Sequence, residues 1–166
     1  SLGQDRGGDA ILTVGTTPLL RAAKACDTAG AKLLLERGAL PDLQNSLGAA
    51  PLMVAAGIGW NTTDIRGRFR NEPQCIETAR VLVAAGASVN TGDRYGDHAL
   101  NWAAFFGHAP FVALLLEHKP DLQRTGQSDD WAIEIAIREG HAEVVALLAA
   151  AGAVARPGKD KPPAKP

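Results

Sequence analysis

The residues that could support acid–base or metal chemistry are few in this sequence and lie far apart. The four histidines are His98, His108, His118 and His141. A zinc site would need ligands at short paired spacings, and these residues are not paired in that way. The sequence therefore predicts no metal site.

Motifs for nucleophilic or nucleotide chemistry are also missing. The sequence contains no Gly-x-Ser-x-Gly motif, no phosphate-binding Gly-Lys-Ser/Thr motif and no nucleotide-binding glycine pattern. Two carboxylates lie close to a histidine, namely Asp93, Asp97 and His98. Their place in a turn-rich stretch favours a role in shaping a turn or capping a helix. We therefore predict no catalytic residue, no cofactor and no enzyme activity.

A strip of arginines is the other group of residues that could bind a ligand. Arg66, Arg68 and Arg70 alternate along the chain, with Trp60 and Phe69 nearby. If the strip is extended, the three guanidinium groups point the same way and could accept a carboxylate or a phosphate. The alternative is that they pair with neighbouring acids while the two aromatic rings pin the segment down.

Apolar segments recur along the chain in one register. Their first markers are Leu19, Leu52, Leu100 and Ile133, and the first and last of the three intervals are equal while the middle one is longer. A second apolar block follows at Leu34, Leu82, Leu115 and Leu148, at one fixed spacing in three copies and at twice that spacing in the second. The one irregular interval indicates a 15-residue insertion in the second copy, at about residues 59–73.

Each copy predicts two helices joined by a turn. In the first copy, Thr17 can cap a helix that begins at Pro18. Small residues around Ala22 allow a second helix, which includes Leu33, Leu34 and Leu35, to approach closely. Glycines at one register predict left-handed helix ends at Gly38, Gly86 and Gly152, whereas Lys119 at that register predicts a less regular end.

Polar segments connect the copies. Between Gly38 and Pro51 the sequence is rich in turn formers, which predicts an extended, hairpin-like connector. The threonine that precedes the first helix is not kept in the later copies. Asp97 and Asp130 could take over its capping role in the last two.

A 33-residue unit that opens with Thr17, Pro18 and Leu19 resembles the ankyrin repeat. The resemblance covers about residues 15–153 and implies a mainly α fold. That fold is an ankyrin-repeat solenoid of four helix-turn-helix repeats with hairpin-like connectors and one 15-residue loop insertion. One such unit cannot bury its apolar face alone, so the units must stack. The expected bounds are a lead-in at 1–14, a repeat domain at 15–155 and a disordered Pro/Lys tail at 156–166, with repeats at about 15–47, 48–95, 96–128 and 129–155.

The repeat register also places the histidines and cysteines. The resemblance implies a structural hydrogen-bonding role for His108 and His141, at the Gly-His turn common in ankyrin units. Cys26 aligns with Gly107 and Gly140, and Cys75 aligns with the two histidines. Packed helices lie about 8–10 Å apart, and a disulfide needs Cα atoms within about 7 Å. We therefore expect two unpaired thiols that fill gaps between copies, although the insertion beside Cys75 leaves a disulfide open.

The resemblance implies a surface for protein partners. Ankyrin repeats commonly grip partners with the connector tips and the exposed face of the first helix in each pair. Carried over by register, these positions are Lys24, Ser46, Leu47, Ile58, Arg94, Tyr95, Phe105 and Arg138. Large aromatic and arginine side chains are favoured at interfaces. We therefore predict a patch built on Arg94, Tyr95 and Phe105, with Arg138 beside it. The alternative is that these rings pack within the chain.

Composition limits the remaining classes of function. The chain has 166 residues, 46% of them hydrophobic, and a formal net charge of −1. That charge gives no attraction toward nucleic acid or an anionic membrane, and no apolar run is long enough for a membrane span. The chain begins at Ser1 without methionine, so the cytoplasm and export after signal removal both stay open.

The sequence therefore predicts a non-catalytic module that binds a protein or peptide, as a monomer or as a subunit of a hetero-complex. Two alternatives stay open. The chain could be an accessory or inhibitory subunit, or a fragment of a larger multidomain protein. It could also bind an anionic small ligand or a polyanion through Trp60, Arg66, Arg68, Phe69 and Arg70 of the insertion.

Overall fold

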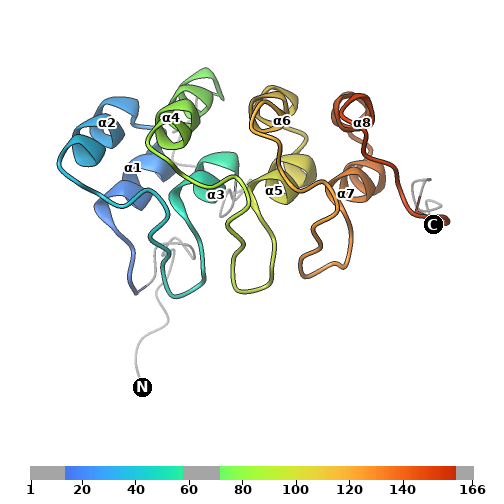
Figure 1. Cartoon of the computed structure of the whole chain (residues 1–166), viewed down its shortest axis with the longest axis horizontal. Coiled ribbons are helices and arrows are strands. Elements are labelled where there is room, and N and C mark those ends of the chain that lie inside the picture. The colour runs from blue at the N-terminus through green and yellow to red at the C-terminus, as the bar shows by residue number, and fades with distance from the viewer. Residues whose placement is uncertain (1–13, 58–71, 160–166) are drawn as a thin grey trace, which may run out of the picture.

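The computed structural model of this chain describes residues 14–57 and 72–159. This part contains eight α-helices and no β-strand. The helices are α1 (Pro18–Ala25), α2 (Thr28–Glu36), α3 (Pro51–Ala56), α4 (Glu72–Ala84), α5 (Ala99–Phe106), α6 (Ala109–Leu116), α7 (Ala132–Glu139) and α8 (Ala142–Ala150). They form four antiparallel pairs stacked side by side (Figure 1). The predicted helical solenoid is confirmed.

The helices lie in two layers. The first helix of each pair contacts the first helix of the next, from α1 through α3 and α5 to α7, while α2, α4, α6 and α8 form the second layer. The connectors project together beyond the first layer (Figure 1). We call the first layer the inner helices and the projecting turns the connector tips.

Short-range signals explain the helix ends. The Thr17 hydroxyl accepts a hydrogen bond from the Leu20 N–H (3.1 Å), so Thr17 caps α1 as predicted, and Pro18 occupies the first helical position. Gly38 follows α2 with φ 87°. Lys119, expected to disturb the corresponding turn, adopts the left-handed conformation itself (φ 51°), so the third repeat keeps the same turn.

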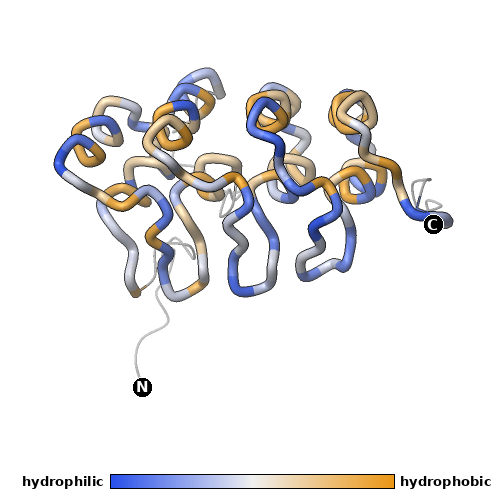
Figure 2. The backbone as a smooth tube through the Cα atoms, viewed as in Figure 1, coloured by the Kyte–Doolittle hydropathy of each residue, from blue (hydrophilic) through white to orange (hydrophobic). Residues whose placement is uncertain are grey.

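Small residues let the layers approach closely. Alanines line the inner helices and are fully or almost fully buried, including Ala23, Ala55, Ala103 and Ala136. Larger apolar side chains from both layers fill the space between repeats. The hydrophobic residues are concentrated in the helices, and the connectors are mainly hydrophilic (Figure 2). Leu33, which we expected to help form this core, is 51% exposed. Consecutive residues of a helix turn by about 100° each, so Leu33, Leu34 and Leu35 cannot all face the core.

Asparagine and aspartate shape the connector tips. The Asn45 carboxamide oxygen accepts hydrogen bonds from the Leu47 and Ala49 N–H groups (both 3.0 Å). In the next connector, the Asp93 carboxylate accepts from Tyr95 (2.8 Å) and Asp97 (3.1 Å). Such local bonds close tight turns without a β-ladder, so the connectors are hairpin-like as predicted.

Neighbouring connectors are also joined to each other. The Arg94 N–H donates to the Leu47 carbonyl (3.4 Å), and the Ser46 N–H donates to the Val14 carbonyl (2.9 Å). At Gly48 (φ 75°) the next connector is so close that a Cβ atom would lie 2.5 Å from the Arg94 nitrogen. The tips therefore form one row in which each turn supports the next.

The close approach at Gly48 predicts a measurable cost. Gly38→Ala, at a left-handed position with nothing within 4 Å, should lower the free energy of unfolding by about 1 kcal/mol through backbone strain alone. We expect Gly48→Ala to cost at least twice as much, because its Cβ also meets the Arg94 backbone. Urea unfolding of the two variants compares the losses. Equal losses would show that the connectors do not touch closely in solution.

Asp97 and Asp130 were expected to cap helices, but neither does so. The N-cap residues are His98 and Trp131, and side chains within the helices bond back to them. The Trp131 N–H donates to Glu134 (3.0 Å), and the His98 N–H donates to Asn101 (3.2 Å). The two aspartates instead brace other segments: Asp97 accepts from the Gln127 N–H (3.1 Å), and Asp130 forms ion pairs with Arg138 and Lys159.

An ion pair between a buried carboxylate and a partly exposed arginine holds the start of the C-terminal segment. The Glu134 side chain is 1% exposed and forms an ion pair with Arg156 (2.6 Å). Arg156 also donates to Glu134 through its backbone N–H and its Nε (both 2.8 Å), and its guanidinium lies 4.9 Å from the Trp131 ring centroid. The expectation of a solvated tail from residue 156 is therefore wrong at Arg156 and Lys159. Residues 160–166 lie outside the described part.

This ion pair predicts how stability depends on pH. Hydrogen bonds from Arg156 lower the pKa of Glu134 from 4.5 to about 2, against the opposing effect of burial. Since the pKa is lower in the folded state, the stabilisation is complete above about pH 4.5 and is lost as the pH falls toward 2. We expect the wild-type melting temperature to fall more steeply over this range than that of Glu134→Gln. Parallel curves, measured by circular dichroism, would contradict this assignment.

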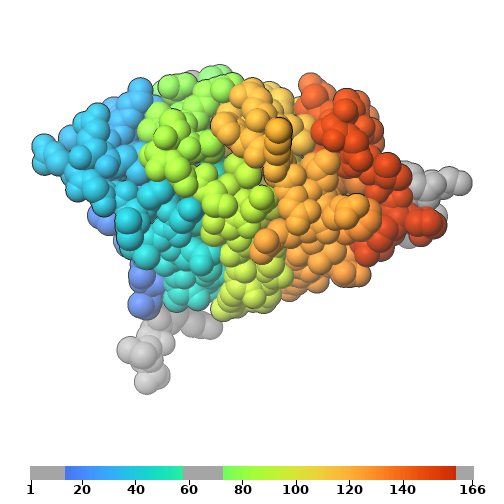
Figure 3. Space-filling view, in the orientation of Figure 1, coloured from blue at the N-terminus to red at the C-terminus, as the bar shows by residue number. Residues whose placement is uncertain are grey.

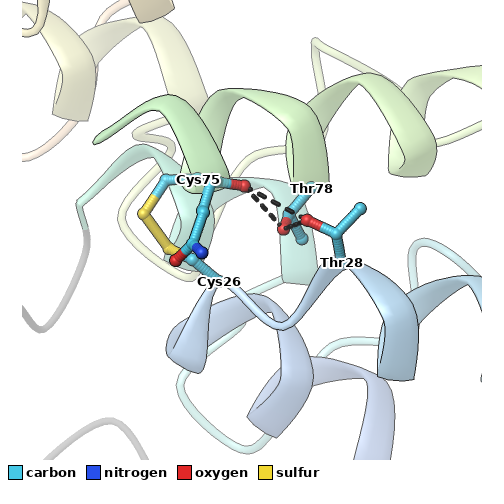
Figure 4. Close-up of a disulfide and its surroundings, with 5 residues drawn as sticks. Cys26, Thr28, Cys75 and Thr78 are labelled. Atoms are coloured by element: carbon cyan, nitrogen blue, oxygen red, sulfur yellow. Dashed lines mark hydrogen bonds between the residues drawn. A yellow bond between two sulfur atoms is a disulfide. The ribbon is translucent and has the colours of Figure 1, made fainter. Parts of the chain in front are cut away.

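The two cysteines form a disulfide, which corrects the expectation of two free thiols. Cys26 and Cys75 are bonded, with Cα atoms 4.6 Å apart (Figure 4). The prediction used the separation of packed helix axes. Cys26 instead lies in the turn that ends α1, where the backbone passes close to α4. The part of the chain that the structure describes has no free cysteine.

Candidate protein-binding surface

The connector tips present one exposed aromatic residue. Tyr95 is 47% exposed, and its backbone N–H is fixed by Asp93. Arg94, also exposed, donates a hydrogen bond to the Tyr95 hydroxyl, and its guanidinium lies 4.6 Å from the ring centroid. These two side chains therefore form one unit that offers an aromatic surface and a positive charge.

The preceding tip is smaller. Ser46 is exposed, while Leu47 is half-buried and packs against the hydrophobic core. Because the Leu47 carbonyl accepts a hydrogen bond from Arg94, the two tips are adjacent along the row. Together they offer polar, aliphatic and aromatic groups side by side.

An aromatic cluster occupies the exposed side of α5. We define it as Trp102, Phe105 and Phe106, whose ring centroids are 5.0–6.3 Å apart. Phe105 is 40% exposed, and the other two rings are half-buried. The Phe106 ring also covers Gly57, where a Cβ would lie 2.7 Å from the ring. Phe105 is thus held on a base of packed rings.

Buried polar groups under this surface fix the connectors. Burial raises the pKa of Asp93, although the hydrogen bonds that it accepts from the Tyr95 and Asp97 N–H groups oppose this effect. Burial lowers the pKa of His98, whose Nε2 lies 3.1 Å from the Asp121 carbonyl oxygen of the next connector. These groups hold backbone segments in place, in agreement with the predicted role of the Asp93, Asp97 and His98 group in shaping turns.

Comparison with known proteins fits this architecture. Residues 70–157 match the model for ankyrin repeats in three copies, and residues 14–46 match the model for a single ankyrin repeat. The chain is 31% identical to human SH3 and multiple ankyrin repeat domains protein 2 over 121 residues, which is 73% of this chain and 6% of that protein. It is 30% identical to mouse ankyrin repeat domain-containing protein 63 over 136 residues, which is 81% of this chain and 32% of that protein.

This chain belongs to the ankyrin repeat family. Ankyrin repeats generally mediate protein–protein interactions, and the family is generally a non-catalytic interaction module. The chain spans less than two thirds of the relatives named above. Within residues 14–57 and 72–159, no helix is both long and apolar enough to cross a membrane.

The other residues predicted to contact a partner differ in their exposure and in their pairing within the chain. Lys24 is partly exposed on α1. Arg138 on α7 forms ion pairs with Asp130 and Glu139, so its charge is already balanced within the chain. Ile58 and the predicted insertion residues Trp60, Arg66, Arg68, Phe69 and Arg70 lie outside the described residues.

Two rings of the aromatic cluster were not part of the predicted surface. Trp102 packs against the hydrophobic core, and both Trp102 and Phe106 support Phe105 from the same helix. The spacing of 102, 105 and 106 is the signal that could have found them, since residues three and four apart share a helix face. The prediction treated each ankyrin position separately and therefore did not group these three rings.

The part of the ankyrin domain that the structure describes contains no group of three or more histidine, cysteine, aspartate or glutamate side chains arranged to hold a metal ion. The His141 Nε2 donates to the Phe105 carbonyl (3.0 Å), which is a structural role of the kind the resemblance implied.

Proposed function

We propose that this chain is a noncovalent binding module for a protein or peptide, and that the partner contacts the connector tips and the exposed side of the inner helices. The module corresponds to residues 15–155. Its centre is Tyr95 with Arg94 at the tip and Phe105 on α5. The supporting observation is that these two rings are 47% and 40% exposed, although Asp93 fixes the Tyr95 backbone and other rings back Phe105.

Exposed large aromatic side chains favour contact with a partner. Burying such a ring removes a large apolar area from water, and interface hot spots are enriched in tyrosine, tryptophan and arginine. Tyr95 and Arg94 together can bury apolar surface and also bond a carboxylate or a carbonyl oxygen of the partner. Binding at this surface requires no reactive group.

The support of these residues keeps the cost of binding small. The Tyr95 backbone is fixed by Asp93, and Phe105 is backed by Trp102 and Phe106. Side chains that are already held in place lose little freedom when a partner binds. The four packed repeats form one continuous body (Figure 3), so the tips and inner helices keep a fixed spacing for the partner.

A footprint of the complex tests this assignment. A partner isolated by affinity capture would be purified and added back, and hydrogen–deuterium exchange would be measured with and without it. We expect slower exchange at the tips (residues 44–48 and 92–97) and in α5, with little change in α2 and α8 of the outer layer. Protection confined to the outer layer would overturn the proposed surface.

A further inference from the structure

The same junction between consecutive repeats is built in two ways in this molecule. In the later repeats, α5 ends at Gly107 in the left-handed conformation (φ 73°), and His141 of the next repeat packs against it. A Cβ at Gly107 would lie 2.6 Å from the His141 ring. The His141 Nε2 also donates to the Phe105 carbonyl (3.0 Å). A glycine and a histidine thus join repeats three and four without a covalent bond.

In the first two repeats, cysteines occupy these two positions. Cys26 follows Leu19 at the same spacing as Gly107 follows Leu100, and Cys75 precedes Leu82 as His141 precedes Leu148. Cys26 takes the left-handed conformation that glycine takes later (φ 52°). This conformation is unfavourable for a residue with a Cβ. The disulfide to Cys75 therefore replaces a glycine–histidine contact with a covalent bond.

The surroundings of the bond are closed to solvent. Cys26 is 4% exposed and Cys75 is fully buried. Beside them, the hydroxyls of Thr28 and Thr78 are hydrogen-bonded to each other (2.8 Å), and Thr78 also donates to the Gln74 carbonyl (2.9 Å) (Figure 4). The bond therefore lies within a packed contact between α4 and the turn that joins α1 to α2, where a thiol reagent has little access.

The bond crosses the junction between the first and the second repeat. Within the described residues the first repeat has a packed neighbour on one side only, where α1 and α2 contact α3 and α4. Units of a repeat array are held by contacts with their neighbours, so a covalent bond across a junction restrains local opening at that junction. The disulfide joins residues 49 positions apart and prevents the first repeat from leaving the second.

We propose that the Cys26–Cys75 disulfide is a permanent structural cross-link that fastens the first repeat to the second, and that this chain matures in an oxidising compartment. The bond forms by thiol–disulfide exchange. The two thiols lose two protons and two electrons, and a donor disulfide accepts both and becomes a dithiol. Cytosolic proteins rarely keep such bonds, because glutathione and thioredoxin hold their thiols reduced.

Hydrogen–deuterium exchange of the free chain tests the fastening role. The variant Cys26→Gly/Cys75→Ala removes the bond and restores the glycine found at this register in repeats three and four. We expect amide exchange in α1 and α2 to become at least tenfold faster than in the wild type, with no change in α7 and α8. Equal exchange in α1 and α2 of both proteins would overturn this role.

Two measurements on the wild-type chain remain decisive even if that variant fails to fold. In a glutathione buffer at the cytosolic reducing ratio, the native chain should keep both cysteines inaccessible to a maleimide reagent, and modification of two thiols would overturn the permanent cross-link. In cells that produce the chain naturally, acid quenching and alkylation should add no alkyl group. Addition of two would overturn the oxidising compartment. None of these tests involves a partner, so they fail or succeed independently of the proposed binding function.

Discussion

Replacing Glu134 by alanine is expected to lower the free energy of unfolding by about 3 kcal/mol, because several hydrogen-bond donors lose a buried, charged acceptor. The Glu134 carboxylate accepts bonds from the Arg156 side chain, the Arg156 backbone and the Trp131 N–H. In a domain of this size that loss should reduce the melting temperature by about 6–12 °C. Calorimetry or thermal circular dichroism measures the shift.

Glu143 provides the matched control for that substitution. It is a glutamate in the first turn of α8 and is exposed, so Glu143→Ala should cost less than about 1 kcal/mol. The double variant Glu134→Ala/Arg156→Ala should lose less stability than the two single variants added together, because the residues act on each other. Strict additivity would show that the pair is not formed in solution.

The helical stack was predictable because it depends on regular spacing. Apolar markers that recur at one interval, each followed by a second block at a fixed distance along the chain, locate the helix pairs whatever the details of the turns. The signals at Thr17 and Pro18 are local and were interpreted correctly. Leu33 was assigned to the core because it lies in a run of three leucines, and the helical rotation places it in solvent instead.

Contacts between distant residues were harder to predict. The pairing of Glu134 with Arg156 joins a helix to a segment whose composition alone suggests a solvated tail. The disulfide was missed because helix-axis distances do not apply to a residue in a turn, and Cys26 ends α1 in a left-handed turn. Both contacts depend on where the backbone goes after a helix ends, which periodicity does not report.

The candidate surface was only partly predictable for the same reason. Register located Tyr95 at a tip and Phe105 on an inner helix, and both are exposed. Register did not show that Arg138 is balanced by Asp130 and Glu139. It also did not show that Trp102 and Phe106 support Phe105, because ring contacts depend on side-chain conformations.

Replacing Tyr95 and Phe105 together by alanine is expected to weaken partner binding on the order of 100-fold, which corresponds to two hot-spot side chains at the centre of an interface. Both rings are partly exposed, so their removal leaves most of the hydrophobic core unchanged. The melting temperature of the double variant should therefore stay within a few degrees of the wild type, about the effect of 1 kcal/mol.

Leu33 and Val154 supply the control. They are also exposed large hydrophobic residues, but Leu33 lies on α2 of the outer layer and Val154 follows α8. The variant Leu33→Ala/Val154→Ala removes a similar kind of exposed apolar surface away from the proposed contact. Its affinity for the partner should equal that of the wild type. This result would distinguish loss of a specific contact from a general decrease in nonspecific hydrophobic association.

Titration calorimetry of the purified partner against wild type and these two double variants tests the central claim most directly. The account predicts a Kd raised on the order of 100-fold for Tyr95→Ala/Phe105→Ala and an unchanged Kd for Leu33→Ala/Val154→Ala. Binding of the partner by the Tyr95→Ala/Phe105→Ala variant with wild-type affinity, while the protein remains folded, would contradict the assignment of the connector tips and inner helices as the binding surface.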